Sequence, residues 1–157
     1  MVLCICYLYL NSDNDDFLYK GSISYITKNT VVVVDQSSSS ILFFSKDGTP
    51  KSRFNHFGQG PREYGRLPVV VYDETADELF VPNNKNGILV YSSLGEYKRT
   101  IKQPQDMRIN YMIDFDDRSL LFYDYNNNSK RLEALMAKTD LPQEDNVLSF
   151  YRISNFP

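Results

Sequence analysis

The chain has 157 residues, 42% of them apolar and 14% aromatic, so it is long and apolar enough to form one domain with a core. Its net charge is −3 and its pI is near 5.1. Nucleic acids and anionic membranes both demand clustered Lys and Arg, so this balance argues against either as a partner. No apolar run approaches the roughly 18 residues of a membrane-spanning helix, and we expect no membrane span.

The N-terminal residues 2–10 form an apolar run that predicts a strand. They lack a basic n-region and a small-residue cleavage site, so we do not expect a signal peptide, and the sequence leaves the localisation open. The opening Met-Val-Leu-Cys is similar to a lipoprotein attachment box, but nothing basic precedes Cys4. We interpret Cys4 and Cys6 as small core residues on one face of this strand rather than as a metal or redox pair.

Short segments rich in Val, Ile, Tyr and Phe, bounded by turn residues, follow one another along the chain and predict strands. In chain order they are residues 22–28, 30–35, 41–45, 67–73, 78–82, 88–92, 108–115 and 119–124. Residues 130–138 have a spacing that a helix would tolerate, but their neighbours favour a strand there too. The sequence therefore predicts an all-β fold.

Turn residues separate these strands at regular intervals. Asp47-Gly48 and Leu94-Gly95 each lie between two strands and predict hairpins, because Gly tolerates the positive φ of tight turns. The Asn-rich residues 83–87 and 126–128 predict loops between further strands. The spacing is typical of an antiparallel meander.

These features repeat along the chain. Residues 34–48 align without a gap with residues 81–95, at an offset of 47 residues, and a weaker third copy begins at residues 120–124. A period of about 40 to 50 residues with four short strands is typical of a β-propeller blade, whose faces are covered by neighbouring blades. We therefore predict one partial propeller domain of about three blades. Their expected bounds are residues 1–58, 59–105 and 106–157.

A Gly-rich stretch between the first two units resembles the signature of a known family. The residues that carry the resemblance are Gly58, Gln59, Gly60, Pro61, Glu63 and Tyr64. They are similar to the Gly-Gln-Gly-Pro-Gly-Glu-Tyr stretch of six-bladed β-propeller proteins abundant in Bacteroides, relatives of NHL-repeat propellers, with Arg62 in place of the usual Gly. The resemblance covers residues 7–155. It implies half of a six-bladed propeller and a periplasmic or cell-envelope location.

The residue types of this stretch suit a rigid crossover between blades. Gly58 and Gly60 permit a tight backbone, Pro61 holds Gly60 extended, and the ring and hydroxyl of Tyr64 can anchor the loop. A Gly-rich loop can also cradle a phosphate, but the Lys and the Ser or Thr of a P-loop are missing. We prefer the structural interpretation. Arg62 puts the family's backbone requirement at that position in doubt, since a non-Gly residue strongly disfavours a positive φ.

Three blades span about half a ring and leave two open faces, which favour association. Family members are usually exported and about twice this length, and the chain departs from them in both respects. We expect either a second copy that completes a six-bladed ring or a truncated chain.

The sequence predicts no catalytic, cofactor-binding or metal-binding residue. The single histidine, His56, supports neither a common zinc site nor a Ser-His-Asp triad, and we place it with Arg62 at the rim of a pocket. The acidic residues 13–16 lack the alternating ligands of a calcium loop. Residues 45–49 are similar to the Asp-box of sialidase propellers but lack its spacing and its Trp, so they predict only a hairpin.

Two further groups of side chains are candidates for binding, and each also has a structural interpretation. Asp114, Asp116 and Asp117 are interpreted as surface carboxylates neutralised by Arg118. The 12 Tyr and 10 Phe side chains could stack on sugar rings, although most aromatic residues of a propeller pack between blades.

The leading functional hypothesis is a non-catalytic β-propeller module that binds a carbohydrate or peptide at its loops. The alternative is a carbohydrate-active hydrolase or lyase whose site is completed by missing blades or a second chain. The third hypothesis is a degenerate fragment that retains no function.

Overall fold

The computed structural model describes residue 10 and residues 20–67, 69–83, 87–102, 109, 111–116, 119–126, 130–137 and 149–150. Within this part of the chain the fold is all-β, and no helix is present that could cross a membrane. In chain order the strands are β1 (Ser22–Ile26), β2 (Thr30–Asp35), β3 (Ser40–Ser45), β4 (Pro50–Phe54), β5 (Val71–Asp73), β6 (Glu78–Asn83), β7 (Gly87–Tyr91), β8 (Tyr97–Ile101), β9 (Tyr111–Asp116), β10 (Ser119–Asn126), β11 (Lys130–Ala137) and β12 (Ser149–Phe150).

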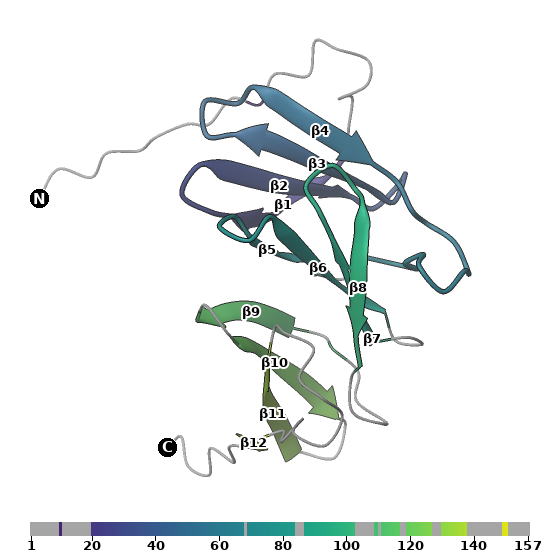
Figure 1. The fold of residues 1–157 in the computed structure, drawn as a ribbon, viewed down its shortest axis with the longest axis vertical. Helices are drawn as coiled ribbons and strands as arrows, with labels where there is room; N and C mark the ends of the chain where they lie inside the picture. The colour runs from purple at the N-terminus through teal and green to yellow at the C-terminus, as the bar shows by residue number, and fades with distance from the viewer. Residues whose placement is uncertain are drawn as a thin grey trace, which may run out of the picture.

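These strands form three four-stranded antiparallel sheets, and each sheet is a simple meander of four consecutive strands. Figure 1 shows the sheets one after another, with β1–β4 and β9–β12 at opposite ends of the molecule. The first strand of the second sheet, β5, lies against the first strands of both other sheets, β1 and β9. Each sheet falls within one of the three ranges expected for a blade, while the blade boundaries themselves stay a prediction.

Most strands lie where the sequence predicts them, and β2 matches its predicted range residue for residue. Residues 130–137 form strand β11, paired with β10, so the helix-compatible spacing does not produce a helix. Residues 67–73 differ, because only Val71–Asp73 form a strand. Leu67 and Val70 are apolar because they are buried in the core, and Gln36 donates a side-chain hydrogen bond to the carbonyl of Leu67.

Both predicted Gly hairpins are present. Gly48 and Gly95 have φ values of 87° and 85°, and each donates a backbone hydrogen bond that closes its turn. At Gly95 a side chain is also excluded by packing, since a Cβ atom would lie 2.6 Å from the ring of Phe54. Phe54 ends strand β4 of the first sheet, so this contact joins two sheets.

The core lies between the sheets. Register pairs Val32 with Phe43 on the face of the first sheet that meets the second, where both belong to one buried cluster with Leu79 and Leu89. The opposite face of the second sheet meets the third through a further cluster of Val71, Phe80, Ile88, Val90, Ile101, Ile109, Met112 and Leu120. Consecutive residues of the central strands are therefore buried on both faces, as packing between blades requires.

Polar contacts add to this packing between the first two sheets. The Glu74 carboxylate accepts hydrogen bonds from the Asn29 backbone N–H (3.2 Å) and from the Thr30 hydroxyl (2.6 Å). Glu74 lies in the turn between β5 and β6 of the second sheet, whereas Asn29 and Thr30 lie where β2 of the first sheet begins. The Ser52 hydroxyl donates to the carbonyl of Ser93 at 2.6 Å, again from one sheet to the next.

Candidate functional site

The loop that leaves β4 and crosses to the second sheet carries the Gly-rich stretch, and its two ends lie side by side. Phe57 and Tyr64 form a parallel bridge, with Gly58 N–H donating to the carbonyl of Tyr64 and Tyr64 N–H to the carbonyl of His56, both at 3.0 Å. A further bond of 3.2 Å runs from Glu63 N–H to the carbonyl of Gly60. The loop, which we call the crossover loop (residues 55–66), is thus closed by its own backbone.

The exposed side chain of Glu63 folds back against the backbone of the crossover loop. Its carboxylate accepts a hydrogen bond of 2.8 Å from the N–H of Gly60 and lies where a Cβ atom on Gly58 would be, at 1.9 Å. Gly58 and Gly60 do not have positive φ values. The requirement for Gly at position 58 therefore comes from the approach of Glu63 and not from backbone conformation. Arg62 does not have a positive φ either, so it fits its position without strain.

Tyr64 ties the crossover loop to the first sheet. Its ring is fully buried, and its hydroxyl accepts a hydrogen bond from His56 N–H at 2.9 Å and donates one to the carbonyl of Ser39 at 3.0 Å. Burial raises the pKa of Tyr64 to about 12, so the hydroxyl stays protonated and able to donate at neutral pH.

Two side chains of the second sheet hold the other side of the crossover loop. The Tyr91 hydroxyl donates to the carbonyl of Arg62 at 2.7 Å, and the Asn83 side-chain amide donates to the carbonyl of Glu63 at 2.8 Å. The loop is therefore bonded to both sheets that it connects. Its outward side chains, Gln59, Pro61 and Arg62, are exposed.

His56 lies within an aromatic cluster rather than alone. Its ring stacks on Tyr91 at 5.4 Å between centroids and 10° between planes, and it lies 5.4 Å from Phe54. Its Nε2 donates to the carbonyl of Gly95 at 2.7 Å, because a carbonyl can only accept. His56 is half-buried by these contacts.

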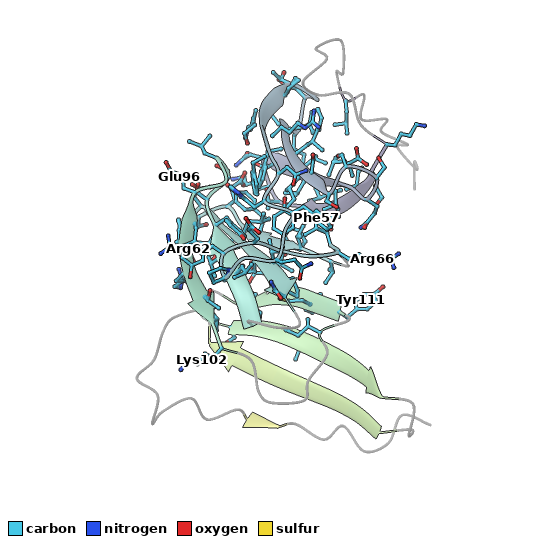
Figure 2. The ribbon with its side chains drawn as sticks, turned by 90° about the vertical axis from the view of Figure 1, so that its right-hand side faces the viewer. Phe57, Arg62, Arg66, Glu96, Lys102 and Tyr111 are labelled. Atoms are coloured by element: carbon cyan, nitrogen blue, oxygen red, sulfur yellow. The ribbon has the colours of Figure 1, made fainter. Side chains whose placement is uncertain are left out.

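The exposed side of the crossover loop carries one aromatic ring, Phe57, and two cations, Arg62 and Arg66, together with the carboxylate of Glu63. Phe57 is 57% exposed, and the Arg62 guanidinium lies 4.8 Å from the centroid of the Tyr97 ring. Among the described residues, no carboxylate forms an ion pair with Arg62. Figure 2 shows Phe57 between Arg62, which lies beside the second sheet, and Arg66 on the other side of the view. Whether His56 and Arg62 line a pocket stays a prediction.

The sequence analysis also considered positions outside the crossover loop. Asp47 lies in the β3–β4 hairpin, where the Ser45 hydroxyl and the backbone N–H of Thr49 lower its pKa to about 2. Cys4, Cys6 and the acidic residues 13–16 lie outside the described part of the chain. Within that part, no group of three or more His, Cys, Asp or Glu side chains could hold a metal ion.

The sequence did not predict that Phe57 is exposed on the crossover loop. It also did not predict that Tyr91 and Tyr97 contact this loop. Phe57 directly precedes the Gly-rich stretch, and that position is the only available signal for it. The two tyrosines are about 30 residues further along the chain, and only the packing of the second sheet against the loop brings them there.

Three consecutive four-stranded meanders, packed face to face and joined by a crossover from the last strand of one to the first strand of the next, are β-propeller blades. Comparison with known families agrees with this class. The chain belongs to the 6-bladed beta-propeller family, whose model matches residues 2–151.

Among solved structures, the chain is similar to a Bacteroides fragilis protein that is described as exported. The TM-score is 0.59 and the sequence identity 19%, which shows a shared fold. The similarity covers 82% of this chain and 38% of the other, so this chain spans well under half the length of that neighbour. No curated protein was found to match the chain.

Proposed function

We propose that the chain is a β-propeller binding module and that the crossover loop is its recognition surface. The observation that carries the proposal is the exposed pair of Phe57 and Arg62 on a loop bonded to both neighbouring sheets. A preorganised loop loses little conformational entropy when a ligand binds. An aromatic ring and a cation that has no ion-pair partner among the described residues suit a carbohydrate or peptide that carries an apolar face and an anionic group.

A cell-envelope setting is part of the same proposal. It is supported by the description of the Bacteroides fragilis neighbour as exported. The resemblance of the Gly-Gln-Gly-Pro-Arg-Glu-Tyr stretch to the family signature supports it as well, and a relation to NHL-repeat propellers is part of the same proposal.

Calorimetric or thermal-shift screening against acidic oligosaccharide and peptide panels tests the binding surface. We expect a ligand that raises the melting temperature of the wild-type chain, and Phe57→Ala and Arg62→Ala each to weaken its binding about tenfold or more. Lys46→Ala, which removes an exposed cation from the β3–β4 turn, is the matched control and should bind as the wild type does. Equal binding by all four proteins would contradict the proposal, as would the absence of any ligand in both panels.

A further inference from the structure

The crossover loop carries a second cation, Arg66, which the proposed recognition surface does not yet use. Arg66 is exposed, and within the described part of the chain neither Arg62 nor Arg66 forms an ion pair with a carboxylate. The carboxylate of Glu63, the residue next to Arg62 in the chain, instead accepts the 2.8 Å hydrogen bond from Gly60 N–H. The loop therefore exposes two guanidinium groups that can each receive an anionic group of a ligand.

Phe57 lies between these two arginines. It forms a parallel bridge with Tyr64, and Tyr64 is the residue midway between Arg62 and Arg66 in the chain. Figure 2 shows the same order in space, with Phe57 between Arg62 and Arg66. Since the side chain of Phe57 is 57% exposed, an accessible aromatic ring has a cation on either side of it.

The surface next to Arg66 is open, and the backbone at both arginines is anchored. A Cβ atom added to Gly65 would meet no heavy atom within 4 Å. The guanidinium of Arg62 lies 4.8 Å from the centroid of the Tyr97 ring, which restricts its position. Arg66 is followed by Leu67, which is buried and whose carbonyl accepts a side-chain hydrogen bond. A ligand that spans both cations would therefore meet a preorganised surface.

The crossover loop offers side chains rather than backbone groups to a ligand. Many peptides bind by pairing with unpaired main-chain groups. Several of those groups are already used here, since four N–H groups of the loop donate within it and two carbonyls accept from the second sheet; the N–H groups are those of Gly58, Gly60, Glu63 and Tyr64, and the carbonyls those of Arg62 and Glu63. The outward ring and the two guanidinium groups instead suit a sugar ring with carboxylates on either side.

We propose that the crossover loop binds a linear acidic oligosaccharide, with one sugar ring stacked on Phe57 and the carboxylates of two uronate sugars bound by Arg62 and Arg66. This inference rests on the proposed function and names its ligand class and a second anion subsite. A densely charged polyanion such as a nucleic acid is disfavoured, because the chain has a net charge of −3 and the loop also carries Glu63. Uronate chains carry a lower charge density.

Isothermal titration calorimetry of the full 157-residue chain with short oligomers of galacturonate, glucuronate and mannuronate tests the ligand class. We expect at least one of these oligomers to bind. Its monosaccharide and its methyl-esterified form should bind at least about tenfold more weakly, because they offer one carboxylate or none. Added salt should weaken the binding of the acidic oligomer, because the two arginines are exposed and salt screens exposed charges.

Substitution of Arg66 tests the second subsite. Arg66→Gln should weaken binding of the acidic oligomer about tenfold, whereas Arg66→Lys, which keeps the charge, should recover part of the loss. Lys28→Gln is the matched control, because it removes an exposed cation from the β1–β2 turn, outside the crossover loop, and should bind as the wild type does. Circular dichroism establishes that each variant is folded, which the exposure of both side chains favours.

The outcomes separate this inference from the proposed function. Acidic peptides that bind through Phe57 and Arg62, with no binding of any uronate oligomer, would overturn the oligosaccharide assignment and leave the proposed function standing. Tighter binding of single-stranded DNA than of any uronate oligomer would overturn it as well. Wild-type affinity of Arg66→Gln, or equal binding of the methyl esters, would refute the second anion subsite. A chain that binds neither oligosaccharides nor peptides would contradict both proposals.

Discussion

Glu63 and Gly58 show how a single contact sets the identity of a residue. The carboxylate of Glu63 accepts a hydrogen bond from the N–H of Gly60 and occupies the space next to Gly58. A side chain at position 58 would push the carboxylate aside. Since the carboxylate is the end of a flexible side chain, the loop itself need not move, and the main loss is the hydrogen bond.

We therefore expect Gly58→Ala and Glu63→Ala each to lower the free energy of unfolding by about 1 kcal/mol, the usual net value of one hydrogen bond. The double variant should cost about as much as either single variant, because both remove the same bond. Gly65→Ala is the matched control: no heavy atom lies within 4 Å of its added Cβ, so its effect should stay within about 0.5 kcal/mol. Urea unfolding measures all four, and additive losses in the double variant would refute the account.

At the scale of an element, the turn between β2 and β3 is organised by Asp35. Its carboxylate accepts hydrogen bonds from the Ser37 N–H (2.8 Å), the Ser37 hydroxyl (2.6 Å) and the Ser38 hydroxyl (2.9 Å). Burial alone would raise the pKa of Asp35, but these bonds outweigh it and lower the pKa from 3.8 to about 2. The same turn supplies the Ser39 carbonyl that receives the Tyr64 hydroxyl, so it also supports the crossover loop.

The sign of the pH dependence follows from the lowered pKa. The folded state holds the Asp35 proton more weakly than the unfolded chain, so the stabilisation is complete above about pH 4 and is lost as the pH falls towards 2. Its size is roughly 2 kcal/mol. We expect Asp35→Asn to be less stable than the wild type at pH 7 by about this amount, with the difference shrinking between pH 4 and pH 2. Urea unfolding across this range measures it; a difference independent of pH would contradict the assignment to Asp35.

At the scale of the whole molecule, burial is greatest in the middle strands of the first two sheets. The central strands β2, β3, β6 and β7 are hydrogen-bonded on both sides, and their residues are almost all buried. The outer strands β4 and β8 have a neighbour on one side only and expose charged residues. Local opening should therefore begin at the outer strands.

Native-state hydrogen exchange followed by mass spectrometry or NMR tests this distribution. We expect amides of the four central strands to exchange at least about tenfold more slowly than those of β4 and β8. Equal protection across each sheet would show that the sheets open only as whole units.

The sequence by itself determined the strands, their hairpins and the blade repeat, because these depend on local patterns. Runs such as residues 31–34 alternate between two buried faces, and Gly48 and Gly95 mark turns that need a positive φ. The Gly-rich stretch was identified as a crossover for the same reason, since Gly and Pro act on the backbone nearby. Residues 67–73 show the limit of this reasoning, because burial in a core makes a segment apolar whether or not it is a strand.

Only the tertiary structure decided which distant side chains meet at the crossover loop and which apolar residues remain uncovered. His56 is held by Tyr91 and Gly95, contacts that depend on how the second sheet packs on the first. Ile23 and Val71 look alike in sequence, yet one is half exposed and the other buried. The physical reason is position in the stack: Val71 lies where the third sheet packs on the second, whereas Ile23 lies on the side of the first sheet that is turned away from the second, and no local pattern records this difference.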